Sequence, residues 1–207
     1  MSINQYNYWP TPIFHFHMIW DDHQEILSEC ENWCKKNNKE VSVMIPDSER
    51  KNTDPYSGMS EDLKNNSKLS RLSKWFEKCV YTAAQQVNGK FWKNLTNNPT
   101  VTITDLWAWS STDYYNHYHG HPNSSWSGIY YLDVCDTHKH GHTRFYSPLP
   151  YNHYSDAGTL FFDAESSIAY EPGDGLLIIF PSYIRHEGMP YRSDKKRTVI
   201  AFNTQIN

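Results

Sequence analysis

Three histidines stand at alternate positions in the segment HYHGHPNSSWSGIYYLD, residues 117–133. In an extended chain, alternate side chains share a face and lie about 7 Å apart. Because Pro122 would end a strand there, His119 and His121 are able to converge on one ion. Imidazole is a ligand for iron, zinc, copper and nickel. Two imidazoles alone make a weak site, so a further ligand must come from a distant segment.

The best candidate for that ligand is His186, in the segment GDGLLIIFPSYIRHEGMP. A turn at residues 172–175 precedes an apolar run over residues 176–180, and Pro181 closes the run. A histidine just beyond the end of a buried strand is well placed to face a cavity. Taken alone, the position of His186 favours an ordinary core or surface histidine, so its assignment depends on the rest of the pattern.

Arg197 opens the last expected strand, on which Arg197, Val199, Ala201 and Asn203 share a face. An arginine aimed into a β-sheet core is costly to bury unless a carboxylate or phosphate meets it. The alternative is a solvated turn residue that follows a pair of lysines. If Arg197 points inward, it is suited to bind an anionic group.

Two helices are expected ahead of these segments. Residues 22–36 begin with Asp22 and have Glu25 three residues later, which is typical of a helix start. Residues 69–88 repeat apolar side chains at helical spacing. The pair Asn88–Gly89 indicates the end of this second helix.

After residue 100 the hydrophobic period changes, and short runs of β-branched and aromatic residues alternate with turn clusters. This order predicts an α+β, mainly β protein: a jelly roll (cupin-like, a double-stranded β-helix) braced by N-terminal helices. We expect a single domain over residues 1–207, with helical support at about 20–90 and the jelly-roll core at about 100–207. The expected strands are residues 101–110, 126–133, 143–147, 158–164, 175–180 and 197–203.

The composition excludes several classes of protein. A formal net charge of −4 and a pI near 6.2 disfavour a nucleic-acid partner, which would need a basic face. The N-terminal residues do not read as a signal peptide, and no apolar run reaches the roughly 18 residues of a membrane span. A soluble, cytoplasmic protein is expected. Cys30 and Cys34 are expected to be buried core residues of a reducing compartment rather than a zinc pair.

The order of these pieces resembles that of the iron(II)- and 2-oxoglutarate-dependent oxygenases. HPNSSWSGIYYLD is similar to the segment after their first ligand motif, with the IYYL strand of prolyl-hydroxylase-like members. GDGLLIIFPSYIRHEGMP followed by RTVIAFN resembles the second ligand motif with its downstream arginine. HPNS, WSGIYY, FPS and the opening WPTPIF more closely resemble a small subfamily of these oxygenases from bacteria and phages. The resemblance covers the start of the chain and residues 101–207.

This resemblance implies that His119, His121 and His186 hold iron(II) and that Arg197 pairs with the distal carboxylate of 2-oxoglutarate. Tyr131 would hydrogen-bond to the same carboxylate. The implied enzyme is a dioxygenase that uses O2, releases succinate and CO2, and hydroxylates an unidentified peptide side chain or small molecule. Asn203 would help to line the pocket.

His121 departs from the family pattern, because most members have Asp or Glu at this position. A third imidazole leaves the site with one less negative charge. A halogenase-like site, with a halide in place of the carboxylate, is disfavoured because His121 fills that position. Three arrangements remain open: a three-histidine site, a ligand pair of His117 and His119 with His121 behind it, or a site completed by Asp113, Asp133 or Glu187.

Other aromatic and histidine residues are weaker candidates. Trp109, Trp126 and Tyr183 are expected to flank the mouth of the site and contact substrate. His138, His140 and His142 are expected to form an exposed loop, and His15 and His17 the polar edge of an N-terminal strand. Two alternatives to the oxygenase remain: a cupin-like three-histidine metalloenzyme that does not use 2-oxoglutarate, and a non-catalytic jelly-roll binding protein. An inward Arg197 distinguishes the oxygenase from the cupin-like enzyme.

Overall fold

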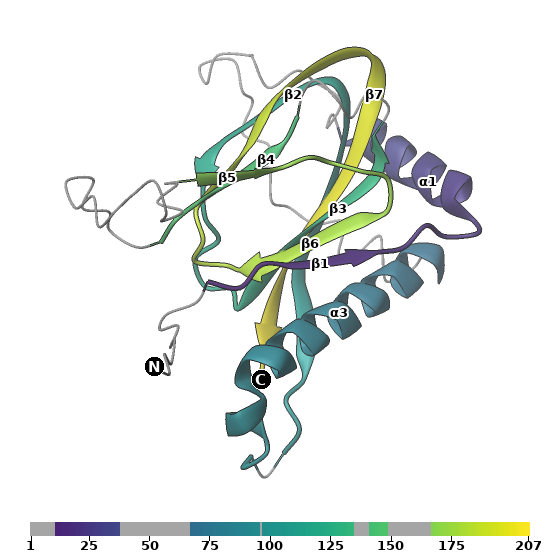
Figure 1. The fold of residues 1–207 in the computed structure, drawn as a ribbon. Helices are drawn as coiled ribbons and strands as arrows, with labels where there is room; N and C mark the ends of the chain where they lie inside the picture. The colour runs from purple at the N-terminus through teal and green to yellow at the C-terminus, as the bar shows by residue number, and fades with distance from the viewer. Residues whose placement is uncertain (1–10, 38–66, 96, 135–140, 149–166) are drawn as a thin grey trace, which may run out of the picture.

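The computed structural model describes residues 11–37, 67–95, 97–134, 141–148 and 167–207. The strands form one curled antiparallel sheet, in the order β1-β6-β3-β7-β4-β5, with β2 paired to β7 (Figure 1). This curled sheet with two helices confirms the expected jelly-roll class. The elements are β1 (Phe14–His17), α1 (His23–Lys36), α3 (Ser67–Trp92), β2 (Val101–His119), β3 (Trp126–Val134), β4 (Thr143–Tyr146), β5 (Ser167–Tyr170), β6 (Leu176–Pro181) and β7 (His186–Ile206).

Strands β2 and β7 form a long antiparallel ribbon that runs from the pair Val101–Ile206 to the pair His119–His186. We expected a first strand that ends near residue 110 and a last strand that begins at Arg197, and both boundaries are wrong. Irregularities in the register, for example between Ser111 and Asp113, bend the ribbon without ending it. Polar residues that read as loops in the sequence therefore belong to the two longest strands.

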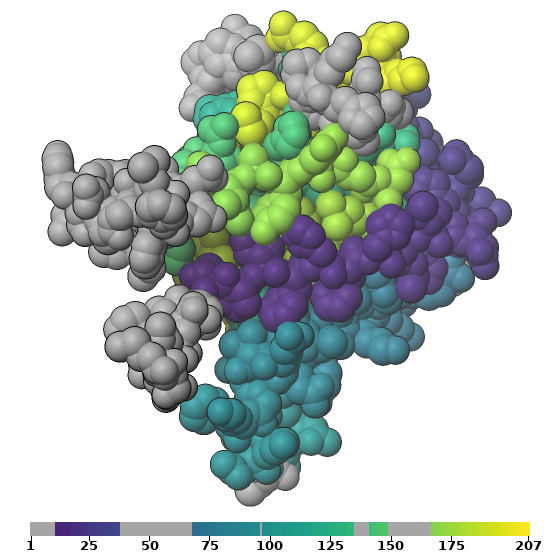
Figure 2. Space-filling view, viewed as in Figure 1, coloured from purple at the N-terminus to yellow at the C-terminus, as the bar shows by residue number. Residues whose placement is uncertain are grey.

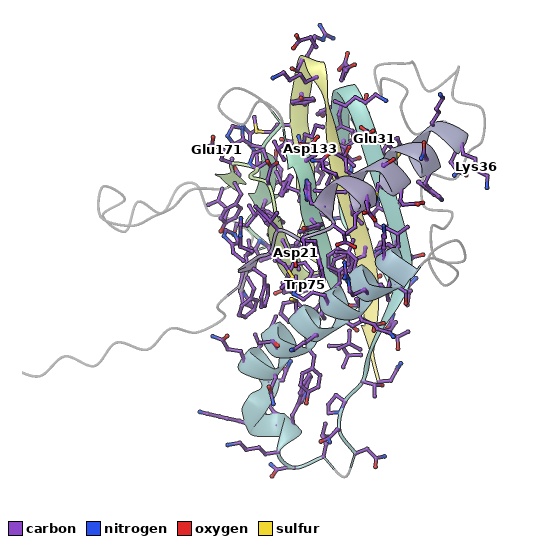
Figure 3. All side chains as sticks on the ribbon, turned by 90° about the vertical axis from the view of Figure 1, so that its right-hand side faces the viewer. Asp21, Glu31, Lys36, Trp75, Asp133 and Glu171 are labelled. Atoms are coloured by element: carbon purple, nitrogen blue, oxygen red, sulfur yellow. The ribbon has the colours of Figure 1, made fainter. Side chains whose placement is uncertain are left out.

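The helices cover the outer face of the sheet. Phe76 of α3 stacks on Phe202 of β7 with 4.6 Å between the ring centroids. Trp75 lies between α3 and the strands, where its ring contacts Tyr130 edge-on at 5.5 Å (Figure 3). In the space-filling view, β1 forms a band between β6 and α3 (Figure 2). The other face of the sheet encloses a second apolar cluster that includes Tyr131, Phe145 and Phe180.

The start of α1 agrees with the sequence expectation, whereas the end of α3 differs from it. Asp22 precedes α1, but its carboxylate pairs with Arg71 of α3 instead of capping the helix. The expected stop at Asn88–Gly89 is wrong, because α3 continues to Trp92. A glycine inside a helix costs only about 1 kcal/mol, and the last turn is supported by a contact of Trp92 with Tyr81 at 5.5 Å.

Cys30, Cys34 and Cys79 are buried, as expected for core residues. His15 and His17 are exposed on β1, at the edge of the sheet. The expected strand at 158–164, together with His138 and His140, lies outside the described residues. Among the described helices, none combines the length and apolarity needed to cross a membrane.

Replacing Gly128 of β3 with alanine should destabilise the fold by about 1–3 kcal/mol, the usual effect of overpacking a core. An added Cβ would lie 2.2 Å from Cζ of Phe202, and Phe76 prevents that ring from moving away. Urea unfolding measures the change. The matched control is Gly89→Ala, whose Cβ would meet no heavy atom within 4 Å. This control should leave stability unchanged or raise it by up to about 1 kcal/mol, and equal losses in both variants would contradict the packing described here.

Candidate active site

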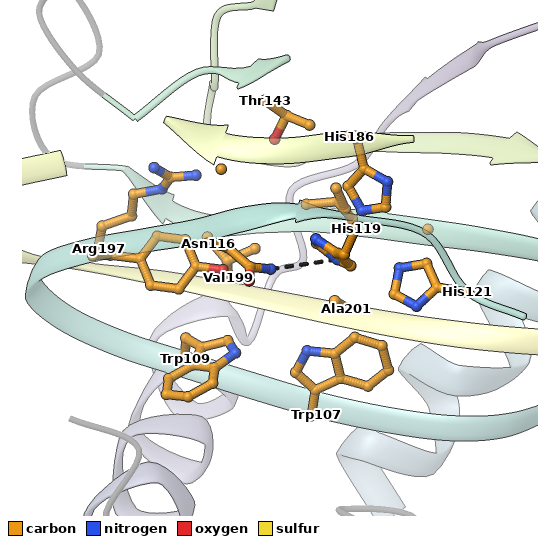
Figure 4. Close-up of a pocket in the computed structure, with 14 residues that line it drawn as sticks. Trp107, Trp109, Asn116, His119, His121, Thr143, His186, Arg197, Val199 and Ala201 are labelled. Atoms are coloured by element: carbon orange, nitrogen blue, oxygen red, sulfur yellow. Dashed lines mark hydrogen bonds between the residues drawn. The ribbon is translucent and has the colours of Figure 1, made fainter. Parts of the chain in front are cut away.

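Three imidazoles meet where the β2–β7 ribbon ends. His119 is the last residue of β2 and lies opposite His186, the first residue of β7. His121 follows β2, and its backbone N–H donates to the carbonyl of Ser182 at 3.1 Å. The ring centroids lie 4.2 Å (His119–His186), 5.0 Å (His119–His121) and 5.1 Å (His121–His186) apart. One ligand atom from each ring lies within 4.8 Å of the others, so the rings face one point (Figure 4).

Backbone carbonyls orient two of these rings. Nδ1–H of His119 donates to the carbonyl of His117, and Nδ1–H of His186 donates to the carbonyl of Ile184 at 3.1 Å. In this tautomer Nε2 carries the lone pair, which is the arrangement found in metal-ligating histidines. The amide of Asn116 lies 3.5 Å from Nε2 of His119 and donates toward it.

Burial keeps the imidazoles neutral. His121 is 8% exposed and His186 is 3% exposed. Burial, with a smaller effect from His119, lowers the pKa of His121 to about 4. Burial also holds the pKa of His186 well below its usual value and lowers the pKa of His119. Near neutral pH all three rings are therefore uncharged, and the neutral ring is the form that binds a metal.

The carboxylates considered as alternative ligands are engaged elsewhere or are not grouped with the imidazoles. Asp113 pairs with Arg192 at 3.1 Å. Glu187 accepts hydrogen bonds from Arg144 at 3.2 Å and from the hydroxyl of Tyr146 at 2.8 Å. Asp133 lies on β3 opposite Thr198.

The position of His117 also differs from that of the three clustered histidines. His117 is exposed, and its ring packs against Tyr115 at 4.7 Å. Within the part of the chain that the structure describes, His119, His121 and His186 form the one cluster of His, Cys, Asp and Glu with metal-binding geometry.

Arg197 lies at the opposite end of the same cavity (Figure 4). Its side chain is 5% exposed, and Nη1 donates to the carbonyl of Gly141 at 2.6 Å. The guanidinium carbon lies 5.2 Å, 5.6 Å and 5.9 Å from the ring centres of Tyr131, Tyr191 and Tyr114. Its Nε is buried without a hydrogen-bond partner among the described residues. A buried cation in an aromatic cage, with a donor unused, is prepared to meet an anion.

Tyr131 and Asn203 occupy different surroundings. Tyr131 is fully buried, and its hydroxyl hydrogen-bonds to that of Thr143, a residue of the cavity wall. Burial raises the pKa of Tyr131, and the charge of Arg197 opposes this change. Asn203 does not line the cavity: its amide accepts from Ser127 at 2.8 Å and donates to Asp105 at 3.4 Å. On β7 it lies beyond the cavity, which ends near Ala201.

Of the three aromatic residues expected at the mouth of the site, one lines the cavity and two do not. Trp109 lines the cavity, beside Trp107, whose ring lies 5.9 Å from that of His121. Trp126 does not reach the cavity, because it is on the opposite face of β3 and packs in the core, 6.0 Å from Phe14. Tyr183 is 62% exposed in the turn between β6 and β7, and it does not line the cavity.

Sequence reasoning missed Asn116, Thr143 and Gly141. Gly141 has φ +84, and a Cβ added to it would lie 2.1 Å from Nη1 of Arg197. Only glycine fits this close approach and this backbone conformation without strain. In the sequence Gly141 stands between two histidines, and no local signal connects it with an arginine far along the chain.

Comparison with known proteins agrees with this geometry. Residues 105–203 match the family described as "Putative 2OG-Fe(II) oxygenase". No curated protein sequence matches the chain. Among solved structures, the chain resembles the non-heme alpha ketoglutarate dependent epimerase SnoN from nogalamycin biosynthesis, with a TM-score of 0.60 and 13% identity, over 94% of this chain and 78% of SnoN.

A second similar structure is HygX from Streptomyces hygroscopicus with nickel and 2-oxoglutarate bound, with a TM-score of 0.54 and 10% identity, over 94% of this chain and 82% of HygX. At these identities the likeness shows the fold. The chain also matches a 2OG-Fe(II) oxygenase family oxidoreductase from Burkholderia pseudomallei at 14% identity and a TM-score of 0.40, over 53% of this chain and about half (47%) of that protein. The clustered imidazoles and the buried guanidinium all lie within residues 105–203, the segment that matches the 2OG-Fe(II) oxygenase family.

Proposed function

We propose that this chain is an iron(II)- and 2-oxoglutarate-dependent dioxygenase that hydroxylates a peptide side chain or a small molecule, with release of succinate and CO2. The observation that carries the proposal is the cavity itself, with three neutral imidazoles at one end and a buried guanidinium at the other (Figure 4). The family match over residues 105–203 supports the class of chemistry.

The imidazole cluster fits a divalent metal. His119, His121 and His186 would hold iron(II) through ring nitrogens that burial keeps uncharged. Nitrogen ligands of this kind suit iron, and also zinc, copper and nickel. No carboxylate lines the described cavity, so the protein leaves the charge of the metal uncompensated. An anionic cosubstrate bound to the metal would supply the negative charge that the family's usual Asp or Glu provides.

The other end of the cavity fits the distal carboxylate of 2-oxoglutarate. Arg197 would pair with this carboxylate, because its Nε has no partner among the described residues and burial strengthens a charge-assisted hydrogen bond. Tyr131 and Thr143 would provide a hydroxyl beside it. The cavity between the two ends measures about 40 Å³, which is small beside the about 300–1,000 Å³ of typical small-molecule sites.

When bound, iron(II) and 2-oxoglutarate supply the oxidising chemistry, in which O2 converts the keto acid to succinate and CO2 and a substrate C–H bond is oxidised. The chain's own residues bind, orient and exclude water. Ile129, Val199 and Ala201 form an apolar wall, and Trp107 and Trp109 complete it. Asn116 lies beside His119 and would donate a hydrogen bond to a group held there. Asn203 would act at a distance, through Ser127, on the strands that form the cavity.

A cupin-like metalloenzyme that does not use 2-oxoglutarate is the second candidate. The absence of a carboxylate among the clustered ligands favours it, since three-histidine sites occur in such enzymes. The buried Arg197 favours the oxygenase, because an enzyme without an anionic cosubstrate has no use for a guanidinium enclosed in the cavity wall. The two candidates separate by whether 2-oxoglutarate binds.

Replacing any one of His119, His121 and His186 with alanine should lower metal content to a small fraction of the wild-type value, because two imidazoles do not make a tight site. Metal analysis after loading with iron(II) under anaerobic conditions gives the measurement. His117→Ala is the matched control, since this ring is exposed and packs on Tyr115. Loss of metal in the His117 variant, with retention in the His121 variant, would favour the alternative ligand pair.

Arg197→Ala should raise the 2-oxoglutarate concentration needed for half-saturation by about 30-fold or more, because removing one partner of a buried charge pair costs 2–5 kcal/mol. The anaerobic charge-transfer band of the iron complex and succinate formation both report this change. Metal content should stay near normal. Gly141→Ala should act in the same direction, since its Cβ displaces Nη1. Arg192→Ala is the control, because Arg192 is 72% exposed and pairs with Asp113.

If both cavity variants bind 2-oxoglutarate as the wild type does, Arg197 is not the cosubstrate ligand. If the wild type shows no charge-transfer band and forms no succinate, the cupin-like or binding-protein alternatives replace the oxygenase.

Metal binding should tighten when 2-oxoglutarate is added, because the dianion compensates a charge that neutral imidazoles leave exposed. Typical coupling free energies of 1–3 kcal/mol correspond to about 5- to 150-fold. Nickel titrations with and without saturating 2-oxoglutarate measure the coupling without turnover. His121→Asp adds a carboxylate, so this variant should bind nickel more tightly alone and show weaker coupling. Identical nickel affinities with and without the keto acid would contradict the charge argument.

A further inference from the structure

A second guanidinium lies at the rim of the imidazole cluster. Arg185 directly precedes His186 and is exposed. Its side chain runs along Gly120, the residue between His119 and His121: a Cβ added to Gly120 would lie 3.3 Å from Cδ and 3.4 Å from Nη1 of Arg185. After burial, the charge of Arg185 contributes to the lowered pKa of His119. The cation therefore lies beside the ligand cluster rather than out along the surface.

Arg185 contacts two neighbours, while its guanidinium pairs with no carboxylate among the described residues. Its backbone carbonyl accepts from the N–H of Tyr146 at 2.9 Å. Its guanidinium carbon lies 5.9 Å from the ring centre of Tyr118, which packs edge-on against Tyr146 at 4.9 Å. The nearest carboxylate in sequence, Glu187, is engaged by Arg144 and by the hydroxyl of Tyr146. No ion pair joins Arg185 to another described residue.

The charges around the cavity do not balance. Arg197 lines the cavity, Arg185 lies outside the lining beside Gly120, and the described lining contains no Asp or Glu. If the proposed function holds, the divalent metal and the dianionic cosubstrate neutralise each other, and both arginine charges remain. Arg197 would meet one carboxylate of the cosubstrate, whereas Arg185 is exposed to solvent next to the residues that carry His119 and His121.

We propose that Arg185 and the ring of Tyr118 form an anion subsite at the entrance, and that the primary substrate carries a carboxylate or phosphate next to an apolar part. This inference rests on the proposed function, because the subsite is defined by its position beside the metal ligands. The ring of Tyr118 is 55% exposed, so it offers an apolar surface beside the cation. The substrate is therefore an amphipathic acid, either a small molecule or an acidic peptide side chain.

Three probes of similar size test the subsite: phenylacetate, phenyl phosphate and the neutral phenylacetamide. Each is titrated into the full chain loaded with nickel and saturated with 2-oxoglutarate, and binding is followed by calorimetry or ligand-observed NMR. At least one anion should bind about threefold to tenfold more tightly than phenylacetamide, and added NaCl should weaken its binding. The tighter of the two anions identifies the group as carboxylate or phosphate.

Arg185→Gln should remove this preference, and Arg185→Lys should retain most of it, because lysine keeps the charge. Arg192→Gln, a change of an exposed arginine paired with Asp113, is the matched control and should bind the probes as the wild type does. Thermal unfolding verifies that each variant is folded. Equal binding of phenylacetamide and both anions, or an undiminished preference in Arg185→Gln, would overturn the proposal.

The same samples test the proposed function separately. Nickel content and 2-oxoglutarate binding are measured before any probe is added. If nickel or 2-oxoglutarate does not bind while the anion preference at Arg185 is preserved, the oxygenase assignment is wrong, and the proposed substrate class falls with it. If nickel and 2-oxoglutarate bind normally but no anion preference is seen, only the proposed subsite is wrong.

Discussion

The continuous pairing of β2 with β7 is the constraint on which the site depends. One ladder places His119 opposite His186 and Ser111 opposite Arg197, so the metal-binding end and the guanidinium end belong to a single bent ribbon. The bulges that interrupt its register turn the ribbon back over the sheet. The helices hold the opposite face through contacts such as Phe76 on Phe202. The cavity is thus the inner side of a curve that the outer core supports.

Electrostatics gives this cavity its chemical character. Burial removes the charge from the imidazoles and leaves the guanidinium of Arg197 enclosed by tyrosines. Because the described lining has no acid, whatever negative charge the site needs must arrive with its ligands. An oxygenase with a carboxylate ligand carries part of that compensation permanently. In the proposed function the cosubstrate would supply this negative charge, which would make a histidine at position 121 compatible with the same fold.

Several parts of the site could be predicted from the sequence, because they rest on local periodicity. The alternation of His119 and His121, the apolar strand before His186 and the strand face of Arg197 are visible in single segments, and their order carries the family resemblance. Positions set by distant partners could not be predicted. Gly141 is required by the close approach of Arg197. The polar ends of β2 and β7 are strands only because they pair with one another. Trp126 was misplaced by one step of strand alternation, which moved it from the cavity to the core.

The position of the imidazoles at the free end of the ribbon has a mechanical consequence. An ion held there would connect the terminal residue of one strand to the first residue of its neighbour, far apart in the chain but paired in the ladder. Such a bridge would hold the last paired residues of the two strands together when the metal is bound. Removing the metal would let these terminal pairs open. Amide hydrogens around residues 116–119 and 186–188 would then exchange with solvent at a rate set by metal supply, so that local order at the ribbon's tip follows the availability of iron.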